Sequence, residues 1–208
     1  MEPAREPTRP RRSPAPEERQ TDAERSRRQL LDAAFDEFAA KGYAGARVHE
    51  IAERAGVNKQ LINYYFGGKE GLYRAMQRHW LAHEATFHEP GRSAADIAEA
   101  YLRDGLDDPR GTRLMVWRGL AYCDGEQTPD EEPEQDLSGI IDRQRAGEID
   151  PDLDPACVLL AMMGAISAPT VMPDMVRKTF GVDPRDPEFR ERYTAFVRDL
   201  ISRFGPRS

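Results

Sequence analysis

Four polar residues within a short stretch carry groups that suit contact with nucleic acid. On a helix with about 100° per residue, one side presents all four: Lys59, Gln60, Asn63 and Tyr64. An amide can pair with adenine through two hydrogen bonds, an ammonium can donate to guanine, and a phenol can contact phosphate or a thymine methyl. The other side carries residues that can pack on a core: Leu61, Ile62, Tyr65 and Phe66. A polar face alone fits an ordinary solvated helix equally well, so the flanking sequence has to decide.

The residues before this stretch predict a short helix and a tight turn. Ile51 and Ala55 are four apart and mark the inner face of that helix. Gly56 lies where the turn requires a left-handed backbone. Asn58 is a good N-cap for the next helix. Helix, turn and helix in this order favour a DNA-binding element over a solvated helix.

An earlier helix is expected to begin at Thr21, because Thr21 and Glu24 have capping-box spacing. Apolar residues then recur at helical spacing, and Lys41-Gly42 is expected to end the helix. Residues 1–19 are rich in Pro and Arg and predict a disordered arm.

Such an arm can be a plain tail, or it can carry Arg9, Arg11 and Arg12 to the DNA backbone or minor groove.

The charge is unevenly distributed along the chain. Residues 1–83 hold 15 Lys and Arg against 12 Asp and Glu, whereas residues 84–208 hold 15 against 25. A mildly basic head on an acidic body suits a protein that touches phosphate at one end only.

The segment from Ile51 to Leu72, IAERAGVNKQLINYYFGGKEGL, resembles the helix-turn-helix of the TetR/AcrR family of regulators. The resemblance covers roughly residues 21–85. It implies an all-α fold, with the arm at 1–19, a three-helix helix-turn-helix DNA-binding domain at 20–67, and a helical effector-binding and dimerisation bundle at 68–208.

The resemblance also implies roles for individual residues. Lys59, Gln60 and Asn63 would lie in the major groove of double-stranded operator DNA, and Tyr65 and Lys69 would grip phosphate beside a helix start. Asn63 replaces a commoner Tyr, which changes the expected base readout but not the docking mode. The family often has Thr or Ser where Ala46-Arg47 stands, so a hydroxyl cap is lost, although the Arg could contact phosphate. The predicted DNA-binding residues are Arg47, Asn58, Lys59, Gln60, Asn63, Tyr64, Tyr65 and Lys69.

The C-terminal part is expected to be helical. A connecting helix should run from about 69 to 88, and further helices are predicted at about 93–106, 110–123, 129–146, 154–167 and 187–204. Asp154-Pro155 is a helix start, with an N-cap followed by Pro in the first turn. Pro169 and Pro173 are expected to end or kink that helix.

Methionine and aromatic residues recur at helical spacing in this part, and they have two readings. They can be ordinary core, or they can line a plastic apolar pocket between helices. The predicted effector pocket consists of Met115, Trp117, Tyr122, Met162 and Met163. The expected effector is an apolar or amphipathic small molecule.

An apolar stripe from Phe189 to Phe204 has three- and four-residue spacing. One monomer could bury it internally. The resemblance implies instead a four-helix homodimer interface shared with residues 156–167. The predicted interface residues are Leu159, Met163, Ile166, Tyr193, Phe196, Val197, Leu200 and Phe204.

Several other classes of function lack support in the sequence. No nucleophile elbow, phosphate-binding Gly loop, catalytic carboxylate pair or metal cluster is evident, so we expect neither enzymatic activity nor a cofactor. His79 and His83 have metal-compatible spacing but lack a third ligand. Cys123 and Cys157 are expected to be small buried hydrophobes. No apolar run reaches the ~18 residues of a membrane span, and no signal-peptide pattern occurs, so a cytoplasmic protein with no membrane partner is expected.

These features predict a repressor that a small molecule releases from a palindromic operator. Two recognition helices about 34–36 Å apart would fit successive major grooves. A ligand in the body would shift the helix at 69–88 and lower operator affinity. The alternative is a helical partner-binding protein without DNA binding, which would tolerate loss of Lys59, Gln60 and Asn63.

Overall fold

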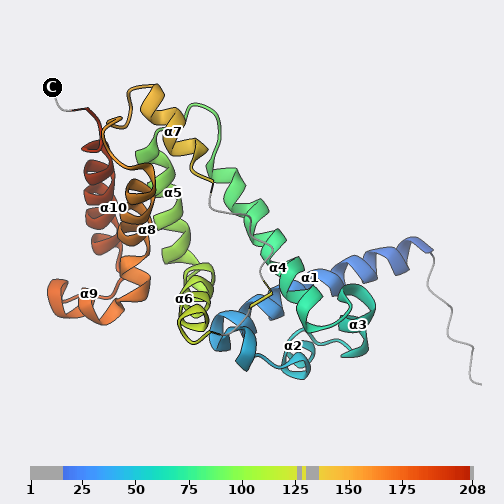
Figure 1. The fold of residues 1–208 in the computed structure, drawn as a ribbon. Helices are drawn as coiled ribbons and strands as arrows, with labels where there is room; N and C mark the ends of the chain where they lie inside the picture. Colours follow the sequence, from blue (N-terminus) through green and yellow to red (C-terminus); the bar gives the residue numbers. More distant parts are fainter. Residues whose placement is uncertain (1–15, 126–127, 130–135, 207–208) are drawn as a thin grey trace, which may run out of the picture.

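The computed structural model describes residues 16–125, 128–129 and 136–206, and the regular structure in these ranges is helical. The expected all-α fold is therefore confirmed. Helices α1 to α4 form a head, and the remaining helices form a body (Figure 1). The elements are α1 (Pro16–Gly45), α2 (Val48–Arg54), α3 (Gln60–Phe66), α4 (Lys69–Glu84), the 3-10 turn η1 (Ala85–Phe87), α5 (Ala94–Asp107), α6 (Arg110–Cys123), α7 (Ser138–Arg145), α8 (Pro155–Val171), α9 (Pro173–Phe180) and α10 (Pro187–Ser202).

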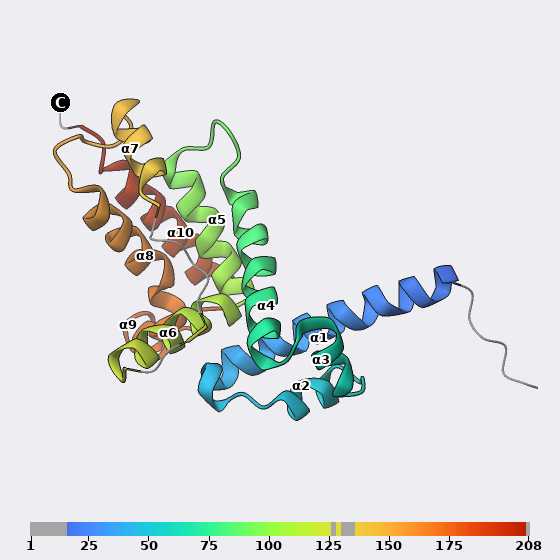
Figure 2. The same ribbon diagram turned by 45° about the vertical axis from the view of Figure 1, so that its right-hand side comes forward.

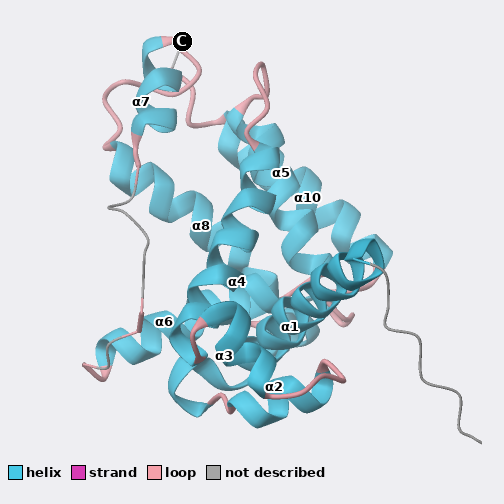
Figure 3. Cartoon of the chain, turned by 90° about the vertical axis from the view of Figure 1, so that its right-hand side faces the viewer, coloured by secondary structure: helices cyan, strands magenta, loops and turns pink. Residues whose placement is uncertain are grey.

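The head is built around the apolar face of α1. Leu30, Ala34 and Phe38 recur every four residues on one side of that helix, and none of them is exposed. Ile51 of α2 and Ile62 of α3 complete the same core. In Figure 3, α2 and α3 lie at the end of the molecule opposite to α7.

The start of α1 differs from the prediction. The helix begins at Pro16, so Thr21 lies inside it and the predicted capping box was wrong. Proline is well tolerated in a first helical turn, because the N–H groups there have no partner within the helix. Residues 1–15, with the arginines of the predicted arm, lie outside the described residues. At the far end, Gly42 turns the chain as expected, with a φ of 67°.

In the body, α5 packs against both α10 and α8, and the three helices run side by side (Figure 2). Ala98 and Leu102 of α5 meet Val158 of α8 and Val197 and Ile201 of α10 in one buried cluster. Burying such a cluster supplies about 25 cal/mol per Å² of apolar area.

The predicted helix at 129–146 is shorter in the structure. Residues 130–135 lie outside the described ranges, and α7 begins only at Ser138. The Asp136 carboxylate accepts the Ser138 backbone N–H at 2.8 Å. This side chain satisfies an N–H group just before the first turn, which favours a helix start there rather than nine residues earlier.

Pro169 does not end α8, which continues to Val171. A proline removes the hydrogen bond to the carbonyl four residues earlier, which here belongs to Ala165. The Tyr193 hydroxyl of α10 donates to that carbonyl at 2.9 Å and so replaces the missing bond. The break comes at Met172, and Pro173 then opens α9, a helix that the sequence pattern did not predict.

Among the described residues, no single helix has the length and apolar composition to cross a membrane. Only α8 and α9 taken together meet that test, and their axes differ by 79° at the break.

Candidate nucleic-acid interface

The turn between α2 and α3 has the backbone that the sequence predicts. Gly56 adopts a φ of 66°, which side-chain-bearing residues rarely adopt. Its N–H donates to the Glu53 carbonyl at 3.0 Å, and the Val57 N–H donates to the Ala52 carbonyl at 3.1 Å. Val57 packs against the head core. These bonds close α2 and fix the direction in which α3 leaves.

Asn58 caps the start of α3. Its Oδ1 accepts the Gln60 backbone N–H at 2.8 Å, and its carbonyl accepts the Leu61 N–H at 2.9 Å. Both bonds satisfy donors that a helix leaves free in its first turn. Gly67, with a φ of 72°, closes the other end. A helix of only seven residues is thereby fixed at both termini.

The two faces of α3 differ as the helical wheel predicts. Ile62 is fully buried, and Leu61, Tyr65 and Phe66 pack against the head core. The opposite side is exposed to solvent: Lys59, Gln60, Asn63 and Tyr64, the last of which is 80% exposed. Their contact with DNA stays a prediction, but nothing in the described chain covers them.

Tyr65 lies between the two faces. Its ring is half-buried and meets the Tyr64 ring edge-on, with centroids 5.0 Å apart. This agrees with the expectation that the Tyr65 ring faces the packed side. Tyr64 is thereby held against a partly fixed neighbour while its hydroxyl end stays in solvent.

The hydroxyl cap of α2 is absent, but a contact that the sequence did not reveal holds the residue before the helix. Arg47 precedes α2 and makes no side-chain cap. The carboxylate of Glu37, from α1, accepts the Arg47 backbone N–H at 3.4 Å. Glu37 is buried, and its charge is balanced by Lys41 at 2.8 Å and by Arg54 at 3.7 Å. A buried carboxylate with cationic partners therefore joins α1 to α2.

Lys41 also pairs with Glu50 of α2. The hydrogen bond to Glu37, followed by that to Glu50, raises the pKa of Lys41. The bond from Lys41 in turn lowers the pKa of the Glu50 carboxyl. Both groups are exposed, so solvent weakens the pair. Lys41 thus neutralises acidic groups beside α2.

Lys69, in the first turn of α4, is held by the end of α1. Its ammonium donates to the Ala44 carbonyl at 3.4 Å and lies 4.6 Å from the centroid of the Tyr43 ring. Burial lowers the pKa of Lys69, and the charge of nearby Arg47 lowers it further. Two neighbouring cations at one edge favour an anion between them.

Arg27 of α1 adds a cation that the motif did not predict. Its guanidinium lies 5.7 Å from the centroid of the Phe66 ring, at the end of α3. The two residues are far apart in sequence, so no local pattern could have indicated the contact. Arg27 extends the basic edge of the head beyond α3.

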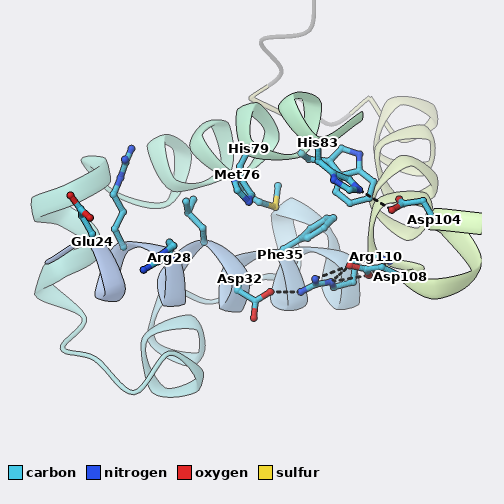
Figure 4. Close-up of a pocket in the computed structure, with 13 residues that line it drawn as sticks. Glu24, Arg28, Asp32, Phe35, Met76, His79, His83, Asp104, Asp108 and Arg110 are labelled. Carbon is cyan, nitrogen blue, oxygen red and sulfur yellow. Dashed lines mark hydrogen bonds and ion pairs between the residues drawn. The ribbon is translucent and has the colours of Figure 1, made fainter. Parts of the chain in front are cut away.

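The five residues of the predicted effector pocket have different surroundings, and their role stays a prediction. Met162 is buried in the body core, and the Trp117 ring packs beside Gly42 of the head. Tyr122 is 85% exposed. Met115 is half-buried, and Met163 is exposed. A cleft of about 820 Å³ lies elsewhere, between α1, α4 and the junction of α5 with α6 (Figure 4).

The predicted dimer residues divide into three groups by their exposure in one chain. Val197 is fully buried within its own chain, so it offers no surface to a partner. Phe196 is 55% exposed and Met163 is 37% exposed. Sequence reasoning missed Leu160, which is 70% exposed. The others are half-buried: Leu159, Ile166, Tyr193, Leu200 and Phe204.

Two smaller expectations concern cysteine and histidine. Cys123 and Cys157 are both exposed, so the expectation of buried cysteines was wrong. They lie at the end of α6 and in the first turn of α8, on sides that no helix covers.

His83 bonds Asp104 at 2.8 Å. Within the described ranges, no group of three His, Cys, Asp or Glu residues is placed to hold a metal ion.

Comparison with known proteins shows which family the chain belongs to. A family model described as "Bacterial regulatory proteins, tetR family" matches residues 30–76. A second, described as "Tetracyclin repressor-like, C-terminal domain", matches residues 94–203.

Curated relatives extend along most of the chain. The HTH-type transcriptional regulator RutR of Escherichia coli K12 is 31% identical over 188 residues, covering 83% of this chain and 86% of RutR. The HTH-type transcriptional repressor SCO4008 of Streptomyces coelicolor is 28% identical, covering 77% of this chain and 86% of SCO4008.

Solved structures agree with the fold. The transcriptional regulator SCO4942 of Streptomyces coelicolor superposes with a TM-score of 0.68 at 26% identity, covering 88% of this chain and 99% of SCO4942. A TetR family regulator of Marinobacter aquaeolei VT8 has the same fold, with a TM-score of 0.63 at 20% identity, covering 87% and 97% of the two chains. The chain belongs to the TetR family of bacterial regulatory proteins, and it is a helix-turn-helix transcriptional regulator.

Proposed function

We propose that this chain is a homodimeric repressor that binds a palindromic operator through α3 and leaves it when a small molecule binds. The observation that carries the proposal is the exposed polar face of α3, whose opposite face is fixed in the head core. A rigid helix that presents amides, an ammonium and a phenol matches the base edges and phosphates of a major groove. Because such a regulator works on the chromosome, we infer that it acts in the cytoplasm.

The direct test is binding to the DNA upstream of the chain's own gene. We expect that fragment to shift in a gel at a salt concentration where unrelated DNA does not. Affinity should fall as salt rises, because phosphate contacts release counterions. A fragment that binds no better than unrelated DNA would count against operator recognition.

Two substitutions separate base readout from phosphate contact. Asn63 is exposed in the middle of the polar face, so Asn63→Ala should cost about 1–3 kcal/mol on the operator and little on unrelated DNA. Lys69 lies at the edge beside Arg47, so Lys69→Ala should weaken binding to all sequences and reduce the salt slope by about 1. Equal loss of specificity in both variants would contradict these roles.

A matched control is available outside this surface. Lys178 is exposed on α9, in the body, far along the chain from the head. Lys178→Ala removes the same charge as Lys69→Ala and should leave the salt slope unchanged. A helical partner-binding protein without DNA function would show no difference among the three variants.

The dimer proposal is supported by apolar surface on two adjacent helices. Leu160 and Met163 of α8 and Phe196 of α10 are exposed although they are large and apolar. Exposed apolar groups on neighbouring helices mark an interaction surface. A second copy of the chain would cover them and place two α3 helices on one operator. Sedimentation of the purified chain as a monomer at micromolar concentration would overturn this part.

A further inference from the structure

The cleft between α1 and α4 contains an aromatic floor. Phe35 of α1 and Trp80 of α4 pack with ring centroids 4.9 Å apart, and Met76 and Leu31 extend the apolar surface. In Figure 4, Met76 and His79 reach from α4 toward α1, and Phe35 reaches back from α1. Phe35 and Met76 are buried, and the Arg110 guanidinium lies over the Phe35 ring, so the accessible apolar surface comes from Leu31 and Trp80. A flat apolar group of a ligand would find complementary surface on these two side chains.

The carboxylates at the closed end of the cleft are already paired. Arg110 donates to Asp32 at 2.7 Å and to Asp108 at 2.7 Å. His83 bonds Asp104 at 2.8 Å. Each of these carboxylates already accepts a hydrogen bond from a protein partner, but one guanidinium faces several carboxylates, so this end stays acidic and repels an anion.

The open end of the cleft has the opposite character. Arg27, Arg28 and His79 line it, and within the described chain no carboxylate pairs with any of them. The Arg27 guanidinium lies over the Phe66 ring. Glu24 lies at the same end and lowers the positive charge by one. Two guanidinium groups remain free to donate to an anion.

We propose that this cleft binds a small aromatic carboxylate, with the ring on Leu31 and Trp80 and the carboxylate on Arg27 and Arg28. Arg is well suited to this role, because its planar fork matches a carboxylate. The volume of about 820 Å³ lies in the usual range for small-molecule sites. That the ligand acts as the effector rests on the proposed function, whereas binding itself does not.

The position of the cleft links occupancy to the DNA-binding face. Its walls are α1 and α4. The chain passes from α3 to α4 through just two residues, Gly67 and Gly68, and the two helices pack against each other. A ligand that changes the spacing of α1 and α4 therefore changes how α3 lies on the head. An effector bound here can therefore change the position of the recognition helix α3 without a rearrangement of the body core.

Calorimetric titration of the full chain with 1-naphthoate tests the site, with the uncharged 1-naphthamide as the matched ligand. We expect one naphthoate per chain and at least about ten-fold weaker binding of the amide, since a charged hydrogen bond is lost. Arg28→Gln should weaken naphthoate by about ten-fold and leave the amide unchanged. Glu24→Gln should tighten naphthoate, because it removes a negative charge from the same end.

Arg25→Gln is the control variant. Arg25 is on the same helix but pairs with Asp22 outside the cleft, so naphthoate binding should be unchanged. The three substituted side chains are exposed, so the fold should be retained, which circular dichroism checks. Equal affinity for naphthoate and naphthamide, or no effect of Arg28→Gln, overturns the proposal.

The same ligand then distinguishes this proposal from the proposed function. If naphthoate binds with the expected discrimination but the chain binds no operator, the regulator proposal fails and the site stands. If the chain binds its operator and naphthoate does not bind, the site alone fails. If both bind and naphthoate does not release DNA, the role as effector site is overturned.

Discussion

Gly71 occupies a position in the first turn of α4 where a methyl group cannot fit. A Cβ at this position would lie 1.8 Å from the Phe66 carbonyl oxygen at the end of α3, and 3.0 Å from its carbonyl carbon. Both atoms belong to the backbone, so no side-chain rotation can relieve the overlap. Gly71→Ala therefore forces α3 and α4 apart at the corner that sets the direction of the recognition helix.

The size of the effect follows from two opposing contributions. Separating the two atoms to ordinary contact needs a movement of more than about 1 Å. Overpacking costs about 1–3 kcal/mol, and a backbone contact belongs at the upper end of that range. Alanine favours a helix over glycine by about 1 kcal/mol. The net loss is about 2 kcal/mol, which lowers the Tm by about 4–8 °C for a chain of this length.

The assay is thermal unfolding at fixed protein concentration, combined with operator binding by fluorescence anisotropy. Gly119→Ala is the matched control, because a Cβ at Gly119 in α6 meets nothing within 4 Å. The same substitution should raise stability there by about 0.5–1 kcal/mol. Operator affinity should fall only in the Gly71 variant, because only that change displaces α3.

The result that would falsify this reasoning is a Gly71→Ala variant as stable as Gly119→Ala with unchanged operator affinity. It would mean that the α3–α4 corner is more open than the structure shows. A loss of stability without loss of affinity at a temperature where both variants are folded would show that the strain is absorbed within α4.

Three further predictions concern the cleft, the body and the dimer. Gly111→Ala places a Cβ 2.2 Å from the Trp80 ring, so the ring must turn and the near-UV circular dichroism should change. Stability should fall by about 1 kcal/mol, because the obstacle is a side chain that can move. The hydrogen bond from the Ser93 hydroxyl lowers the pKa of Asp96 from 3.8 to about 2. The ionised Asp96 therefore stabilises the folded chain above pH 3.8, and this stabilisation is lost as the pH falls from 3.8 to about 2. Asp96→Asn should flatten the pH dependence of the Tm in this window. Leu160→Glu puts a charge on the exposed apolar face of α8 and should convert the dimer to a monomer in size-exclusion chromatography.

The DNA-binding face was predictable because its determinants are local. Gly56 and Asn58 act on their immediate neighbours through the turn and the cap. Ile62 and Lys59 fall on opposite sides of one short helix, so residue spacing separates buried from exposed positions. None of these inferences required knowledge of which helix packs against which.

Helix α8 of the body resisted prediction because it is apolar around its circumference. In α8, Val158 and Met162 face the core, while Leu160 and Met163 face solvent. All four are similar in hydropathy, so the sequence does not indicate the inner face of the helix. The same ambiguity explains why Cys157 was expected to be buried. Which side of α8 is buried depends on the neighbouring helices, and these lie many residues away in the chain.

The surroundings of the predicted effector-pocket residues could not be predicted for a related reason. Met115 and Met162 share residue type and helical spacing, but packing places Met162 in the body core and leaves Met115 half-buried. The cleft that the structure does contain combines Arg28 of α1 with His79 of α4 and Arg110 of α6. A charged cleft between three helices has no signature in any one of them, so only the assembled fold could reveal it.

The contacts between α6 and α1 determine how the body can influence the head. Arg110 bonds Asp32 and stacks 4.7 Å from the Phe35 ring, while Leu114 enters the head core. Two turns after Arg110, the Trp117 ring packs beside Gly42. Contacts spread from Asp32 to Gly42 prevent α6 from sliding along α1 without breaking an ion pair or a ring contact. Movement of the body therefore reaches α1 as a rigid displacement, and α1 carries with it the core on which α3 rests.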